Sequence, residues 1–400
     1  MVVAGIIAEY NPFHKGHQYH IEQTRKVTGA DYIIAVMSPD YVQRGAPALM
    51  DKHTRTKMAL EAGVDLVIEL PLEYACSSAE FFTHGGVVLL SKLEVVNYLS
   101  FGSECGEIEP LMELGYALYD ETDEFQDTLK AELKKGSSFP VARKIALSRE
   151  FPEHAYILDS PNNILAVEYC MSIINYHSHL KPITIKRTSD NYHNTNLSET
   201  YSSASAIRSA LLSNSVSSPS NDNANNEVVS RIQAAIPNEV FKILQNNWLV
   251  NGPLCEDDFS SQLKYKLLSE TAETLTSYLD VSESLANRIV KSLNKFESFS
   301  QFAELLKSKD LTRTRINRAL LHILLNIKTI PQINHARILG FRKDAQPLLS
   351  EIKKTSWIPL VTKPAEMNYD VFAANLYESV LCEKYNRNFV HEYSKPVVIV

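Results

Sequence analysis

The sequence predicts an α/β protein built on a parallel sheet, because short apolar runs alternate with helical segments through its first 210 residues. Near-continuous apolar runs of β-branched residues are typical of strands buried on both faces. Right-handed crossovers would bring the loops that follow such strands to one edge of the sheet. The predicted strands span Val2–Ala8, Tyr32–Met37, Asp65–Leu70, Val95–Phe101 and Ile183–Arg187. The predicted helices of this part span His17–Val27, Lys52–Ala62, Phe82–Leu93, Pro161–Tyr176 and Ser205–Leu212.

Local signals set the ends of several of these elements. The polar stretch Glu9–Gly16 separates the first strand from the first helix, which contains neither Pro nor Gly. The second helix stops before Gly63, and the fourth strand stops before Gly102.

A chain of 400 residues has room for two or three domains of about 150 residues. Residues 213–226 read SNSVSSPSNDNANN, and this polar composition predicts a flexible linker. We therefore predict an α/β domain over residues 1–212 and a mainly helical domain over residues 227–400. The helices predicted in the second domain span Ser260–Leu279, Ser282–Leu293, Ser300–Ser308 and Thr312–Asn326, and extended runs span Trp357–Thr362 and Val397–Val400.

The composition excludes several classes of protein. Hydrophobic residues make up 44% of the chain and charged residues 22%, so wholesale disorder is excluded. The five cysteines are widely spaced without a CxxC pair, which argues against a disulfide framework and against a zinc site. No protein-held metal is predicted. The N-terminus lacks the pattern of a signal peptide, and no apolar run reaches about 18 residues, so we expect a cytoplasmic protein without a membrane span.

Positive charge is concentrated in one part of an acidic chain. The net charge is -7, yet residues 286–354 hold 14 basic and 5 acidic side chains. A local excess of this kind can bind the phosphates of folded RNA, although an ordinary solvated helix face remains the alternative. The candidate RNA-binding residues are Arg288, Lys291, Arg313, Arg315 and Arg318.

The strongest local motif follows the first strand. His14 and His17 flank Gly16 in an HxGH pattern at a predicted helix start. The glycine lets the backbone approach a ligand, and the helix N-terminus supplies N–H donors for phosphate. Two imidazoles there could stabilise charge that develops on a reacting phosphate. Two surface histidines in a turn are the simpler alternative.

The strand and its HxGH loop resemble the nucleotidylyltransferase superfamily, which has a Rossmann-like fold. The longer string from Gly5 to His17 is similar to the tRNA(Met) cytidine acetate ligase family. Further similar stretches begin at Gln43, Leu99, Ser160 and Tyr201, whereas Pro39 and Ala46 depart from the family pattern. The resemblance implies that ATP is bound by Ile7, Ala8, Glu9, Tyr10, Asn11, Pro12, Phe13, His14, Lys15, Gly16, His17, Gln18, Tyr19 and His20, with His14 and His17 as catalytic residues.

More ATP-binding residues follow from the same resemblance, and each has a structural alternative. Gly102 could admit the adenosine or only form a turn, and Asn162 could bind the nucleotide or cap a helix. Arg187 could reach phosphate or simply be solvated at a strand end. A second motif of hydroxyls and an arginine consists of Ser202, Ser203, Ser205 and Arg208. It would bind the β- and γ-phosphates of ATP. The alternative is that its serines only cap a helix.

The resemblance implies an ATP-dependent ligase. Acetate would attack the α-phosphate to form acetyl-adenylate, and the exocyclic amine of the wobble cytidine of elongator tRNA(Met) would then take the acetyl group. Mg²⁺ is expected with the triphosphate. Two rivals stay open: an adenylyltransferase acting on a small molecule, and a non-catalytic RNA-binding protein with a vestigial nucleotide pocket. No oligomeric state is predicted.

Overall fold

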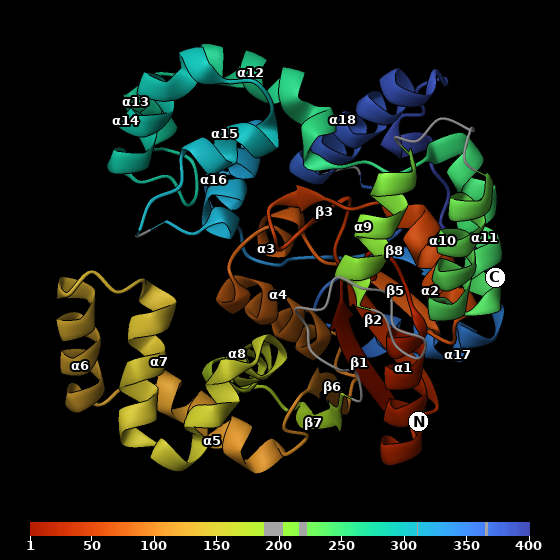
Figure 1. Cartoon of the computed structure of the whole chain (residues 1–400). Coiled ribbons are helices and arrows are strands. Elements are labelled where there is room, and N and C mark those ends of the chain that lie inside the picture. Colours follow the sequence, from red (N-terminus) through yellow and green to blue (C-terminus); the bar gives the residue numbers. More distant parts are fainter. Residues whose placement is uncertain (188–202, 216–221, 310, 365–366) are drawn as a thin grey trace.

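The computed structural model describes residues 1–187, 203–215, 222–309, 311–364 and 367–400. Within these residues the predicted α/β class is confirmed: an eight-stranded sheet has the order β10-β8-β5-β2-β1-β6-β7, with β9 paired to β8 (Figure 1). The five strands from β5 to β7 in this order are parallel, and β8 runs antiparallel to β5. The strands of the sheet are β1 (Val3–Ala8), β2 (Tyr32–Met37), β5 (Leu66–Glu69), β6 (Tyr98–Ser103), β7 (Lys181–Lys186), β8 (Ala336–Phe341), β9 (Leu360–Val361) and β10 (Val398–Ile399).

Helices cover both faces of the sheet (Figure 1). Successive side chains along a strand therefore point alternately into two apolar layers. Val3 and Ile7 of β1 belong to the layer of α4, α5, α8 and α17, whereas Ala4 and Ile6 belong to the layer of α1, α2 and α9–α11. The first layer contains α4 (Ala79–Lys92), α5 (Ile108–Tyr119), α8 (Pro161–Asn175) and α17 (Gln346–Thr355). The second contains α1 (Lys15–Thr28), α2 (Lys52–Glu61), α9 (Ala204–Ser215), α10 (Asp222–Ala235) and α11 (Asn238–Asn251).

Helix α4 packs so closely on β1 that two positions in the contact must be glycine. A Cβ on Gly5 would lie 2.6 Å from the Leu90 side chain, and a Cβ on Gly86 would meet Ile7. Both glycines let the helix approach β1 without an intervening side chain. Helices α6 (Asp123–Lys134) and α7 (Phe139–Glu150) form a hairpin that extends from this layer (Figure 1), and η1 (Pro152–Asp159) follows.

A second apolar core belongs to a helical body, which Figure 1 shows above the sheet. The helix expected over Ser260–Leu279 is instead two helices, because Thr271 caps a new start by accepting the Thr274 N–H at 3.2 Å. Tyr41 and Tyr377 join this body to the loop after β2 through bonds to Ala373 O and Ala48 O. The body contains η2 (Glu256–Phe259), α12 (Ser260–Leu268), α13 (Ala272–Leu275), α14 (Glu283–Ser292), η3 (Leu293–Lys295), α15 (Phe299–Leu305), α16 (Arg313–Leu325) and α18 (Asn368–Tyr385).

The sheet extends past the predicted domain boundary. Strands β8, β9 and β10 come from the part predicted to be a separate helical domain, and β8 pairs with β5. The predicted linker also overlaps helices, since α9 ends at Ser215 and α10 begins at Asp222; residues 216–221 lie outside the described residues. The division into two domains thus remains a prediction, with the last strands belonging to the first sheet. No helix within the described residues is both long and apolar enough to cross a membrane.

A buried ion cluster ties the end of the chain to the sheet. Lys52 contacts Glu69 at 2.5 Å and Glu392 at 2.9 Å. Arg337 of β8 donates to the same two carboxylates, at 2.8 Å and 2.6 Å, and all four side chains are at most 2% exposed. Glu392 lies in η5 (Glu392–Ser394), while Arg337 is followed by η4 (Lys343–Ala345). Burial opposes ionisation of Glu69, but Arg337 and Lys52 hold its pKa below the usual value.

Candidate nucleotide site

A cavity of about 220 Å³ opens at the carboxyl ends of β1 and β6, where parallel α/β sheets bind ligands. Strand β1 ends at Ala8, and the loop to α1 forms one wall. The sequence-predicted residues that line the cavity are Ile7, Ala8, Glu9, Tyr10, Asn11, His14, His17, His20, Gly102, Asn162, Arg187, Ser203, Ser205 and Arg208.

Other predicted residues lie outside this cavity. Phe13 is fully buried in the core beneath the loop, and Lys15 and Gln18 line a separate hollow. Pro12, Gly16 and Tyr19 are not among the lining residues. Ser202 lies outside the described residues.

The two histidines of the HxGH motif form the N-terminal cap of α1. Nδ1 of His14 accepts the Gly16 N–H at 3.0 Å, and Nδ1 of His17 accepts the His14 N–H at 3.3 Å. A nitrogen that accepts an N–H carries no proton, so each neutral ring holds its proton on Nε2. The rings stack with centroids 3.8 Å apart. The cap therefore sets the tautomer of both histidines and leaves an Nε2–H donor on each.

All three histidines of the cavity are neutral near pH 7. Burial, together with the positive charges of Arg187 and Arg208, lowers the pKa of His14 to about 3. Burial and the neighbouring His14 hold the pKa of His17 well below its usual value. Burial and Arg187 lower the pKa of His20 to about 4, and its Nε2 lies 2.9 Å from Ser100 Oγ. The cavity therefore presents imidazole N–H donors without placing extra positive charge there.

These shifts predict a loss of stability in acid. The unfolded chain binds protons at these rings near pH 6.5, whereas the folded chain does so only at lower pH, so the free energy of unfolding falls as pH decreases below 6.5. Each ring contributes up to about 1.4 kcal/mol per pH unit. His14→Asn keeps an acceptor for Gly16 N–H but cannot bind a proton in this pH range. The free energy of unfolding, measured with denaturant at pH 7 and pH 5, should therefore fall less between the two pH values than it does in wild type.

A matched control is His177→Asn, at an exposed position with φ of 51°, which asparagine tolerates. In this variant the free energy of unfolding should change between pH 7 and pH 5 by the same amount as in wild type. An unchanged slope in His14→Asn would contradict the assignment of the buried neutral ring.

Guanidinium groups give the cavity its charge. Arg208 of α9 donates to Asn11 O at 2.7 Å and to Ser205 Oγ at 3.0 Å, so it connects the HxGH loop with the second motif. Ser203 both lines the cavity and caps α9, accepting the Ala206 N–H at 3.1 Å. Arg187 and Arg44 also line the cavity, which brings the number of guanidinium groups in its described part to three. The single carboxylate in that part is Glu9. Such an excess favours a polyanion.

Gly102 and Asn162 lie on the β6 side. A Cβ on Gly102 would touch Arg187 Cγ at 3.4 Å, so the glycine leaves room beside that side chain. Asn162 lines the cavity, but its amide already donates to Glu104 Oε1 at 2.6 Å. The neighbouring Asn163 accepts the Glu104 N–H at 2.8 Å, which fixes the turn after β6.

Sequence reasoning missed part of the wall and its support. Phe82, Phe101, Leu165 and Tyr169 line the cavity, and Phe101 stacks on Tyr169 with centroids 5.2 Å apart. A flat apolar wall of this kind suits an adenine ring. In the sequence these apolar residues cannot be distinguished from ordinary core residues. Only the fold brings the helices and β6 together at the cavity.

Arg55 supports the site from beneath. Its guanidinium is fully buried and donates to Glu9 O at 2.7 Å, to Ser38 O at 3.1 Å and to Pro39 O. It thereby holds the loops after β1 and β2 together. A lysine has no planar set of five donors and could not bind these carbonyls in the same way.

The candidate RNA-binding residues lie on the helical body, and several are already engaged. Arg313 pairs with Glu304 at 3.0 Å, and Arg318 with Asp280 at 3.2 Å. Arg288 donates to Leu306 O at 2.8 Å. Lys291 is exposed on α14, and Arg315 forms no ion pair with any residue that the structure describes.

Helix α16 packs against the hairpin that forms part of the wall of the nucleotide cavity. Gln43 and Arg44 line the cavity from the hairpin β3 (Tyr41–Val42) and β4 (Ala46–Pro47). The next residue, Gly45, has φ of 74°, and a Cβ there would strike the α16 backbone at Asn317 and Arg318. This close approach connects the basic helix to the cavity wall, which could not be seen in the sequence.

A Rossmann-like sheet with an HxGH cap and an arginine-lined cavity defines a nucleotidyl transferase, and the comparisons agree. The sequence pattern of the HIGH Nucleotidyl Transferase family matches residues 1–392. The chain is 39% identical to a tRNA(Met) cytidine acetate ligase of Clostridium acetobutylicum, with full coverage of both chains. A ligase of the same name from Clostridium perfringens is also 39% identical, covering 94% of this chain and 95% of its own.

Two solved structures of Thermotoga maritima TmcAL are similar over all of this chain. The apo form has a TM-score of 0.91, 31% identity and 100% coverage of its own chain. The form bound with alpha-thio ATP has a TM-score of 0.88, 30% identity and 99% coverage. This protein belongs to the tRNA(Met) cytidine acetate ligase family.

Proposed function

We propose that the chain is an ATP-dependent ligase that acetylates N4 of the wobble cytidine of elongator tRNA(Met). The observation that carries the proposal is the single cavity shared by His14, His17 and Arg208, at the carboxyl end of β1 and beside the hairpin that packs on the basic helix α16. The relatives that carry this name and the TmcAL structure bound with alpha-thio ATP support it.

In the first step, an acetate oxygen attacks the α-phosphorus of ATP. The bond to the bridging oxygen breaks, and pyrophosphate leaves with the electron pair while acetyl-adenylate remains. Arg208, Arg187 and the hydroxyls of Ser203 and Ser205 would bind the negative phosphates. The Nε2–H groups of His14 and His17 would donate to oxygens on which charge develops. No protein nucleophile takes part.

In the second step, the cytosine amine attacks the acetyl carbon. The bond to the adenylate oxygen breaks, AMP leaves, and the proton of the amine passes to water or to the departing phosphate. The target base must leave its stack to reach the cavity, which costs least in a single-stranded loop such as the anticodon loop. Mg²⁺ would enter with the triphosphate, whose oxygens supply most of its ligands. We place the reaction in the cytoplasm, where tRNA is available.

Incubation of the full chain with labelled acetate, ATP and bulk tRNA tests this function. We expect label in N4-acetylcytidine after nuclease digestion and separation of nucleosides, and AMP in equal amount. Omission of ATP should abolish the product. Label in a small molecule instead of tRNA would favour a small-molecule adenylyltransferase.

The basic helix provides a separate test. Arg315→Gln should weaken tRNA binding and reduce the slope of log K against log salt by about one, because one phosphate contact is lost. Arg342→Gln is the matched control, since Arg342 pairs with Asp344 at 3.3 Å beyond the end of β8. Filter binding at several salt concentrations measures both. Equal slopes in wild type and Arg315→Gln would exclude this side chain from the interface.

A further inference from the structure

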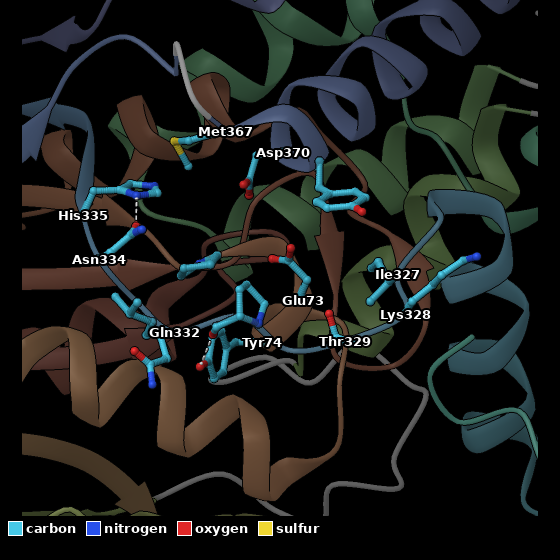
Figure 2. Close-up of a pocket in the computed structure, with 14 residues that line it drawn as sticks. Glu73, Tyr74, Ile327, Lys328, Thr329, Gln332, Asn334, His335, Met367 and Asp370 are labelled. Carbon is cyan, nitrogen blue, oxygen red and sulfur yellow. Dashed lines mark hydrogen bonds between the residues drawn. The ribbon is translucent and has the colours of Figure 1, made fainter. Parts of the chain in front are cut away.

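A second cavity, of about 210 Å³, lies at the same edge of the sheet as the nucleotide site but over β5 and β8 (Figure 2). Its walls come from α3 (Leu72–Ala75), from the connection between α16 and β8, and from the start of α18. Its apolar and aromatic lining residues include Pro71, Tyr74, Pro331, Met367 and Tyr369. None of these residues lines the nucleotide cavity.

Two acidic side chains line this cavity from opposite sides, Asp370 from above and Glu73 from below in Figure 2. Glu73 is only 5% exposed and Asp370 only 7%. Asp370 Oδ1 accepts the Leu72 N–H at 3.1 Å. The Glu73 carboxyl has no side-chain donor among the residues that the structure describes, and its own backbone N–H is its hydrogen-bond partner. Burial of a carboxylate without an ion-pair partner is costly.

The nearby cations do not neutralise Glu73. Lys328 lines the cavity, but its Nζ lies over the Tyr278 ring, 5.0 Å from the centroid. Lys52 and Arg337 contact Glu69 and Glu392 in the ion cluster. Glu73 therefore forms no ion pair within the described part of the chain.

We propose that this cavity binds a small organic cation with a primary ammonium group. The ammonium offers three N–H donors to Glu73 and Asp370, and Tyr74 and Tyr369 can cover its carbon body. A bare metal ion fits less well, because His, Cys, Asp and Glu of the described residues form no cluster of three that could hold one. Anions are disfavoured by the two carboxyl groups.

The ionisation of the pair agrees with this ligand. Burial and the charges of Glu69 and Glu73 raise the pKa of Asp370 to about 8, opposed by Lys52. Burial also raises the pKa of Glu73. The pair therefore binds a proton more readily than exposed carboxyl groups do, and an ammonium beside it would favour release of that proton. The charged or titratable groups around the pair are Glu69, Lys52, Arg337, Cys76, Lys328, His335, Tyr74 and Tyr369.

Isothermal titration calorimetry of the full chain with n-butylammonium chloride tests the proposal. We expect saturable binding at one site, with release of up to one proton at pH 7, measured in two buffers of different ionisation enthalpy. 1-Butanol, which lacks the charge, and tetramethylammonium, which lacks N–H donors, should bind at least about 10-fold more weakly. ATP should not compete. Absence of saturable binding, or competition with ATP, would overturn the proposal.

Variants separate ligand binding from a structural role. Glu73→Gln should weaken butylammonium binding at least about 10-fold while ATP affinity stays unchanged. The free variant should be no less stable than wild type, because a buried carboxyl without an ion-pair partner is replaced by a neutral amide, whose oxygen can accept the same backbone N–H. Glu283→Gln, at an exposed acid in the first turn of α14, should bind butylammonium like wild type. Full binding by Glu73→Gln, or a marked loss of its stability, would overturn the assignment.

Discussion

Replacing His17 with alanine is expected to lower acetate-dependent exchange of pyrophosphate into ATP by at least about 100-fold. The substitution removes the Nε2–H donor of the cavity and also the Nδ1 acceptor that caps α1. Since α16 lies on the other side of the Gly45 hairpin, tRNA binding should change by no more than about twofold.

His17→Asn distinguishes the two functions of the ring. Asparagine can accept the His14 N–H in place of Nδ1 but has no group at the position of Nε2. We expect this variant to fold like wild type and to lose exchange as completely as His17→Ala. Wild-type exchange by either variant would remove His17 from the chemistry.

The second large effect concerns stability. Arg337→Met should lower the free energy of unfolding by about 3–5 kcal/mol, because it leaves Glu69 and Glu392 buried with Lys52 as their remaining close cation. Denaturant unfolding at pH 7 measures the change. The loss should be smaller when Glu69→Met is added, since one of the stranded carboxylates is then absent.

Arg342→Met is the control for this prediction. Arg342 follows the same strand, is about one-third exposed, and pairs with the exposed Asp344 at 3.3 Å and, at the longer distance of 3.8 Å, with Asp65. A surface pair of this kind contributes at most about 1 kcal/mol. If the two arginine variants lost the same stability, the buried cluster would not be what holds β8 on the sheet.

The parallel part of the sheet could be predicted because its strands are buried on both faces. Such strands appear in the sequence as continuous runs of apolar residues. β1 and β2 begin and end within one residue of the predicted ranges. Strand β8 escaped prediction because Arg337 lies within it, and a charged residue inside an apolar run argues against a buried strand. Only the carboxylates of Glu69 and Glu392, far away in sequence, make that arginine acceptable there.

The site divides in the same way. The position of the HxGH motif between a strand and a helix could be predicted because its residues are contiguous, but the sequence analysis did not predict that the two imidazoles cap the helix. The aromatic wall of Phe101 and Tyr169 and the guanidinium of Arg55 could not, because each depends on elements that meet only in the folded chain. The roles of the binding residues stay predictions until the variants are measured.

The antiparallel pairing of β5 with β8 has a consequence for how the protein is made. While the ribosome is still adding residues before position 336, β5 has a bare edge that can pair with another nascent chain. The sheet gains β10 only when residues 398–399 emerge, so its assembly joins segments that lie more than 300 residues apart in the sequence. Chains released early should accumulate as aggregates and not as shortened enzymes.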